Sequence, residues 1–126
     1  MLQILYYQKA IPLEATINSD KNESNPYIAP TEDYLIYFSD RTGGFGDTDL
    51  YISFKKNHKW SYPINLGNKV NSQIGEFCPG VDLKNKLFTF SRTQVDNGKR
   101  IENIYSIPIK NLKLNKLKRS AKWSVP

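Results

Sequence analysis

Two short apolar runs, separated by a polar and glycine-rich stretch, dominate the hydrophobic pattern of this chain. Residues 34–38 (YLIYF) and 50–54 (LYISF) are aliphatic and aromatic, too short for a helix and suited to strands. Because polar and apolar residues do not alternate in the first run, we expect both faces of that strand to be covered. The intervening residues 39–49 contain three glycines, which favours a long hairpin loop with Gly43 and Gly44 at positive φ.

A second, degenerate copy of this pattern follows about fifty residues later. Matched residues occur in the same order with few gaps, which indicates an internal repeat. The matches are residues 17–19 (INS) with 70–72 (VNS), Glu23 with Glu76 and Pro26 with Pro79 at an offset of 53, and, after a one-residue gap, residues 35–39 (LIYFS) with 87–91 (LFTFS), Arg41 with Arg92 and Asp49 with Asn103.

Each copy divides into short strands. The first copy has candidate strands at residues 27–29, 34–39, 50–55 and 63–66, and four antiparallel strands in about fifty residues are typical of a propeller blade. The sequence therefore predicts an all-β fold, a partial β-propeller of about two four-stranded antiparallel blades plus the end of a preceding blade. The expected division of the single segment 1–126 is residues 1–22 as the end of a preceding blade, 23–72 as a blade, 73–114 as a degenerate blade and 115–126 as a basic tail.

The repeat resembles the WD40-like β-propeller repeats of TolB-type propellers and of many bacterial envelope proteins. The resemblance covers residues 18–109 and rests on the combination of E-x-x-P, YLIYFSDR, GGFGxxDLYISF and WSxPxNLGxxVNS. It implies a propeller fold, a binding role and a periplasmic or secreted location, although no signal peptide is visible, and it carries over no catalytic residues. The second copy departs from the pattern because its loop, residues 93–102, lacks the Gly-Gly-x-Gly core. The residues assigned to the structural repeat motif are Ser39, Asp40, Arg41, Gly43, Gly44 and Asp49, with Ser91, Arg92 and Asn103 in the second copy.

Charge is distributed unevenly along the 126 residues. Residues 1–98 carry ten Lys/Arg against eleven Asp/Glu, whereas residues 99–126 carry eight Lys/Arg against Glu102 alone. The basic residues punctuate a final strand and a tail instead of alternating with aromatic residues on one face, so we predict a solvated end and no nucleic-acid partner. Contact of this end with an acidic polymer or a membrane surface is the alternative. No apolar run is long enough to span a membrane.

Residues with catalytic or metal-binding chemistry are few. The single cysteine, Cys78, and the single histidine, His58, cannot build a structural zinc site or a Ser-His-Asp triad. Asp40, Asp47 and Asp49 offer oxygen ligands, but their spacing is not that of an EF-hand, and capping of the loop is the favoured role. We therefore predict no metal and no cofactor.

Three residues are candidates for ligand binding. Glu23 and Glu76 open the innermost strand of each copy, where a ring of carboxylates could bind a cation or a polar ligand. The favoured alternative is that they pair with Arg41 and Arg92 and tie one blade to the next through bidentate bonds. Trp60 could stack on a sugar, although such a residue more often covers the outer edge of a sheet.

These features predict a non-enzymatic binding scaffold for a protein or carbohydrate partner. The alternative is the propeller part of a hydrolase, either a sialidase-like glycosidase or a serine-peptidase-associated propeller; a basic-tailed adaptor for nucleic acid is a third class. An open arc of two blades would leave Leu35, Tyr37 and Tyr51 in water, so we expect either a segment of a longer propeller or copies that assemble to close a ring.

Overall fold

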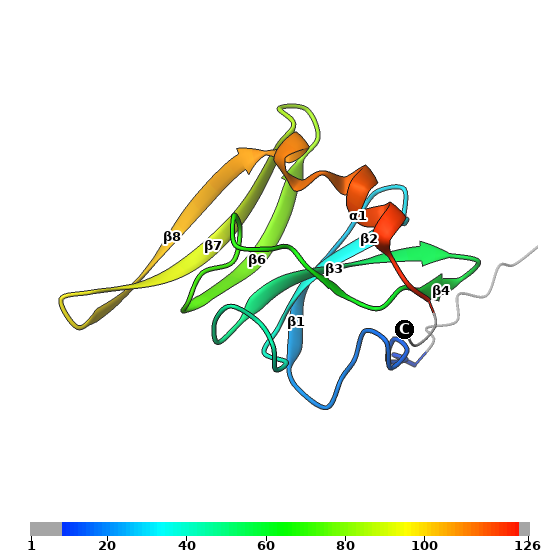
Figure 1. Cartoon of the computed structure of the whole chain (residues 1–126), viewed down its shortest axis with the longest axis horizontal. Helices are drawn as coiled ribbons and strands as arrows, with labels where there is room; N and C mark the ends of the chain where they lie inside the picture. Colours follow the sequence, from blue (N-terminus) through cyan, green and yellow to red (C-terminus); the bar gives the residue numbers. More distant parts are fainter. Residues whose placement is uncertain (1–8, 124–126) are drawn as a thin grey trace, which may run out of the picture.

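The computed structural model describes residues 9–123 and is built mainly of two antiparallel sheets (Figure 1). The prediction of a mostly β, antiparallel chain is confirmed, and the described residues form two stacked sheets and not a closed ring. The first sheet contains β1 (Glu23–Ile28), β2 (Tyr34–Ser39), β3 (Asp49–Lys56), β4 (Lys59–Trp60) and β5 (Ile64–Asn65). The second contains β6 (Gly75–Asp82), β7 (Leu87–Asp96) and β8 (Lys99–Pro108), and the chain continues into the 3-10 helix η1 (Ile109–Leu112) and the helix α1 (Leu114–Ser120).

The first sheet has the order β1-β2-β3, with β4 and β5 both pairing with β3. Strand β2 is buried at five of its six positions, as the unbroken apolar run predicts. It lies opposite β3 in a regular register in which Tyr37 faces Tyr51 and Ile36 faces Ile52. The two pairs point to opposite faces, so the sheet has an apolar surface on each side.

The second sheet, β6-β7-β8, repeats the first three strands without the predicted one-residue gap. Tyr27 pairs with Ile36 in the first sheet, and Gly80 pairs with Thr89 in the second, so both partners keep the offset of 53. The gap in the alignment is therefore wrong. Because a shift of one residue moves a side chain to the other face of a strand, Phe88 takes the place of Leu35, and Leu87 does not.

The hydrophobic core lies where the two sheets share one cluster of buried side chains. From the first sheet it receives Ile36 and Ile52, and from the second Phe88 and Phe90, all 2% exposed or less. Burial of side chains of this size contributes roughly 1.5–3 kcal/mol each. Apolar packing thus holds the second sheet against the first. The face of the second sheet that takes part is the one that carries Phe88 and Phe90.

The opposite face of the first sheet is also buried. Leu35, Tyr37 and Tyr51 are 6% exposed or less and form a second cluster with Ile17 and Trp60. The prediction that Leu35, Tyr37 and Tyr51 would lie in water is wrong. Ile17, from the segment before β1, and the indole ring of Trp60, from β4, pack against them.

The outer face of the second sheet differs in chemistry from the corresponding face of the first. Thr89 pairs with Ser106 on this face, at the positions where the first sheet pairs Ile36 with Ile52. Large apolar side chains on this face include Leu87, which is half-buried, and Ile104, which is 82% exposed. Hydroxyl groups keep contact with water at low cost, so most of this face suits solvent and not a third apolar sheet.

The long loop between β2 and β3 joins the two sheets. The N–H of Asp47 donates to the carbonyl of Ile74 at 2.8 Å, and the N–H of Glu76 donates to the carbonyl of Thr48 at 3.0 Å. Gly46 lies so close to the backbone of Ser72 and Gln73 that a Cβ would overlap them. The loop is a hairpin connection, as predicted, and it also positions the start of β6.

The basic end of the chain is helical and packed against the core. Figure 1 shows η1 and α1, in orange and red, running from the second sheet towards the β4 end of the first. Leu112 is 7% exposed within the main cluster, and Trp123 Nε1 donates to the carbonyl of Lys59 at 3.0 Å. The basic end, which we predicted to be solvated, therefore covers part of the core. No described helix is long and apolar enough to cross a membrane.

Candidate functional site

Glu23 is held at the start of β1 by a group of hydrogen bonds that we call the first Glu–Arg tie (Ser19, Glu23, Ser39 and Arg41). The backbone N–H and the hydroxyl of Ser19 donate to its two carboxylate oxygens at 2.9 and 2.7 Å. The Ser39 hydroxyl donates to Oε2 at 2.7 Å, and Arg41 Nη2 lies 3.3 Å from the same oxygen. Four donors therefore converge on one carboxylate.

Glu76 is held at the start of β6 by the second Glu–Arg tie (Ser72, Glu76 and Arg92). The N–H of Ser72 donates to Oε1 at 2.7 Å and its hydroxyl donates to Oε2. Arg92 Nε donates to Oε2 at 2.9 Å. The Glu76 side chain is fully buried, so these donors replace the water that its charge would otherwise require.

Both ties form the Glu–Arg pairs expected from the repeat. Each guanidinium also donates to a backbone carbonyl in the segment before its own sheet: Arg41 to Ile17 at 3.0 Å and Arg92 to Val70 at 2.7 Å. Val70 lies in the connection that follows β5, so the second tie fastens one sheet to the next. The predicted pairing is confirmed, but the predicted bidentate geometry is wrong, because in each tie one guanidinium nitrogen contacts one carboxylate oxygen.

The first tie favours the ionised form of Glu23. Burial alone raises the pKa of this carboxyl, but the hydrogen bonds from Ser19 and Ser39, with the charge of Arg41, outweigh burial and hold the pKa below its ordinary value. Glu23 is therefore a charged anchor, and it is poorly suited to act as a general acid.

The candidate binding residues lie inside the fold. The side chains of Glu23 and Glu76 are 7% and 0% exposed and fully engaged in the two ties. Trp60 is 8% exposed in the second cluster, where its ring covers the sheet and is not on the surface for a sugar to stack on. All three side chains therefore have structural contacts: Glu23 and Glu76 in the ties, and Trp60 in the second cluster.

Two of the three loop aspartates act as caps. Asp49 is buried and accepts from the N–H of Phe45 and from Asn65 Nδ2, the latter at 2.9 Å. Asp40 accepts from the N–H of Asn22 at 2.8 Å, whereas Asp47 is exposed. Across residues 9–123, no three His, Cys, Asp or Glu side chains gather where they could hold a metal ion.

The motif residues of the second copy do not all repeat the roles of the first. In the first sheet Glu23 pairs with Ser39 across the two strands, and in the second sheet Glu76 pairs with Arg92. Arg92, and not Ser91, therefore occupies the position equivalent to Ser39. Asn103 is exposed and donates to Gln94 at 3.3 Å, so it does not close a loop as Asp49 does.

The two glycines expected at positive φ differ from each other. Gly43 has a φ of +92°, as predicted, with open space where a Cβ would lie. Gly44 does not share that conformation; a Cβ there would overlap the carboxylate of Asp49. The requirement at Gly44 is close approach and not backbone conformation.

Sequence reasoning missed a buried amide network behind β3. Asn71 accepts from the N–H of Leu50 at 2.8 Å and donates to its carbonyl at 3.0 Å. The same amide donates to Asn65 Oδ1 at 2.8 Å. The repeated motif that ends in Val-Asn-Ser holds both Asn71 and the Ser72 of the second tie, so the repetition itself was the available signal.

The surface of greatest repeat symmetry lies where β1 runs beside β6. Asn25 and Cys78 occupy equivalent positions, 53 residues apart, with φ of 50° and 51° in matching irregularities of the two strands. The N–H of Cys78 donates to Asn25 Oδ1 at 3.2 Å. Ser24 beside them is exposed. We call this surface the inner-strand edge (Ser24, Asn25, Pro26 and Cys78).

No protein-family model matches the chain, and neither a curated protein nor a solved structure matches it.

Proposed function

We propose that the chain is a WD40-like β-propeller segment that serves as a non-enzymatic scaffold for binding a protein or carbohydrate. The observation that carries the proposal is the repeated Glu–Arg tie, in which two glutamates 53 residues apart each pair with an arginine that lies in the second strand of its sheet or just after it. The stacking of β6 on the first sheet and the matched irregularities at Asn25 and Cys78 support the same conclusion.

Catalysis is the less supported function for these residues. An active site requires groups with different roles that converge on a pocket, whereas Glu23 and Glu76 have equivalent positions and equivalent partners. Both carboxylates are saturated by internal donors. Repeat-equivalent positions favour a structural role for the pair and leave the surface between the ties for a ligand.

The inner-strand edge is the surface that we assign to the ligand, because there the two copies present equivalent groups side by side. The test is to screen the immobilised chain on peptide and glycan arrays and to remeasure each hit with two matched variants. Ser24→Arg places a long charged side chain at the edge, and Ser106→Arg places the same side chain on the outer face of the second sheet; both serines are exposed strand residues.

We expect Ser24→Arg to weaken binding by roughly ten-fold or more, which is the loss of one well-placed contact, and Ser106→Arg to leave it unchanged. Equal effects of the two variants would place the ligand elsewhere. Turnover of fluorogenic sialosides or peptides, abolished by Glu23→Gln or Glu76→Gln, would contradict the scaffold and support the hydrolase alternative.

A further inference from the structure

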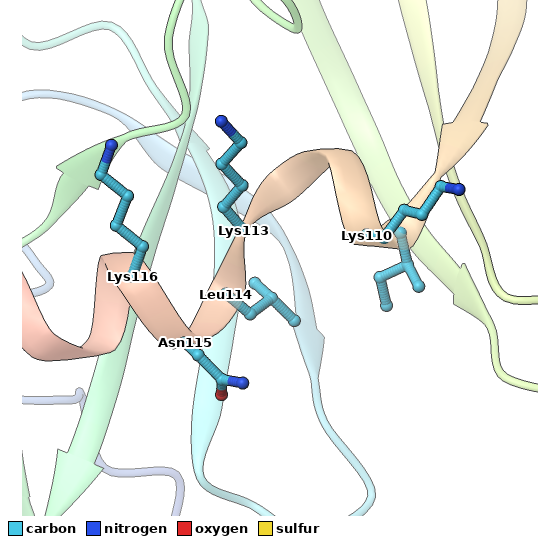
Figure 2. A pocket seen from close by; sticks show the side chains of 6 residues that line it. Lys110, Lys113, Leu114, Asn115 and Lys116 are labelled. Carbon is cyan, nitrogen blue, oxygen red and sulfur yellow. The ribbon is translucent and has the colours of Figure 1, made fainter.

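A set of lysine side chains surrounds η1 and α1. Figure 2 shows Lys113 and Lys116 extending to the same side of the ribbon, with Lys110 at the η1 end. All three are exposed, as is Lys69, which approaches the helix from the connection after β5. We call these four residues the lysine face (Lys69, Lys110, Lys113 and Lys116).

Two adjoining hollows run along the lysine face. The larger, of about 510 Å³, is lined by Lys110, Lys113 and Lys116 with Ile109 and Leu114. The second, of about 300 Å³, includes Lys69 and again Lys113 and Lys116, now with Leu66 and Leu117. Each hollow therefore combines ammonium groups with half-buried aliphatic side chains.

The positive charge of this face is not compensated nearby. The sequence contains no Asp or Glu after Glu102, and the two ion pairs formed within residues 9–123 are those of Arg41 and Arg92. Lys118, Arg119 and Lys122 extend the basic character along the same segment. The field around the helix is consequently positive and attracts anions.

Lys113 occupies a backbone conformation that favours glycine. It joins η1 to α1 with φ 54° and ψ 52°, in the left-handed region, where a side chain other than Gly, Asn or Asp is disfavoured. Glycine would satisfy this junction without strain. The Lys113 side chain lies between the two hollows and lines both of them.

We propose that the lysine face docks on an anionic phospholipid surface. Lysines clustered on a short amphipathic segment attract anionic headgroups, and the aliphatic lining suits the boundary between headgroups and acyl chains. Among the described residues that line the hollows, none is aromatic and none is arginine. Single-stranded nucleic acid would use aromatic rings for base stacking, and defined carboxylates or phosphates would favour the bidentate fork of arginine.

The test is flotation of the whole chain with vesicles of phosphatidylcholine alone or mixed with phosphatidylglycerol, at low and at high salt. We expect binding to the mixed vesicles only, weakened by salt because the contact is electrostatic. Lys113→Gln with Lys116→Gln should lower the partition coefficient by roughly 25-fold, about five-fold for each lysine. The matched control is Lys21→Gln with Lys99→Gln, which removes two exposed lysines that line neither hollow and should have a much smaller effect.

Lys113→Gly separates loss of binding from loss of folding. It should raise the denaturant midpoint of unfolding, because it relieves the left-handed backbone, and still lower vesicle binding by roughly five-fold. Equal losses in the two double variants, or no binding to mixed vesicles at low salt, would overturn the proposal. Tighter binding to single-stranded DNA or to polyglutamate than to vesicles would also overturn it, in favour of an acidic polymer.

Discussion

Each buried glutamate of the repeat carries a charge that only its own neighbours can compensate. For Glu76 these are Ser72 and Arg92, and for Glu23 they are two serines and Arg41. Removal of one partner leaves a carboxylate without water and with fewer donors, which costs more than the net contribution of the pair itself. Substitution of a residue in either tie should therefore cause a measurable loss of folding stability.

Arg92→Ala should lower the free energy of unfolding by about 3–5 kcal/mol, because it leaves the fully buried Glu76 without its cation. Arg41→Ala should cost about 2 kcal/mol, since Glu23 is slightly exposed and keeps two serine donors. Urea unfolding measures both losses, with the exposed Arg100→Ala as the control. Wild-type stability in Arg92→Ala would show that the tie does not form.

The stabilising effect of Glu23 should depend on pH. Its pKa in the folded chain is below the ordinary value of 4.5, so the ionised form is favoured by folding, and its contribution is complete above the ordinary pKa. The contribution is lost as the pH falls through 4.5 towards the lowered value. The stability difference between wild type and Glu23→Gln, measured by urea unfolding across pH, should be largest near neutrality and shrink in acid. A difference that grows in acid would contradict this assignment.

The two neighbouring glycines should differ in their tolerance of alanine. Gly43→Ala meets open space and should cost about 1 kcal/mol for the positive φ alone. Gly44→Ala should cost more, roughly 2 kcal/mol or above, because Asp49 is fixed by hydrogen bonds and cannot move aside. Thermal unfolding of the two variants checks the order. A reversed order would mean that the loop has another conformation.

Among the elements, the C-terminal helix α1 is the one whose secondary structure and burial are hardest to predict from the sequence. Leu112, Leu114 and Leu117 are spaced by single or paired polar residues, a pattern that is too short to distinguish a helix from a frayed strand. The decisive factor is tertiary, because Leu112 fills a position in the core cluster that forms only when both sheets are in place. Local propensity could not supply that information.

Leu112→Ala should test whether this segment is part of the core. We expect a loss of about 2–5 kcal/mol, the cost of truncating a buried leucine. Asn115→Ala, in the same segment but exposed, should change stability by about 0.5 kcal/mol or less. Equal and small effects in denaturant unfolding would support a solvated tail.

The strands, in contrast, could be predicted to within a few residues. The composition of the two apolar runs predicts strands β2 and β3, and the internal repeat predicts β6 and β7. The register of β7 could not be predicted, because Leu87 and Phe88 are both apolar and an alignment with one gap gains an identity at Leu35. Only the pairing of β6 with β7 decides which of them faces the core.

The candidate site shows a similar division. The Glu–Arg pairing could be predicted because both partners recur in the two copies. For Asn71 the repeat marks the residue, but it does not reveal that the buried amide bonds to the backbone of β3. Burial of Trp60 depends on Ile17, from a segment distant in sequence. The sequence therefore left Trp60 among the candidates for ligand binding, although long-range packing buries its ring.

For the whole molecule, the central claim is that two copies of one structural unit stack in the same orientation, so that the face of the second copy equivalent to Leu35 packs against the Ile36 face of the first. Phe88 in the second unit takes the place that Leu35 holds in the first, and it packs into the core shared with Ile36 and Ile52. The outer face carries Thr89 and other polar side chains. This stacking is what the proposed scaffold requires and what a slipped register would abolish.

Nuclear Overhauser contacts between phenylalanine rings and isoleucine methyl groups test this claim most directly. With Phe, Ile and Leu selectively labelled, the rings of Phe88 and Phe90 should show contacts to isoleucine methyl groups of the first sheet, Ile36 and Ile52 among them. Leu87 should show none, because it lies on the outer face. Contacts from Leu87 to the first sheet, with Phe88 and Phe90 accessible to solvent, would contradict the stacking and restore the gapped alignment.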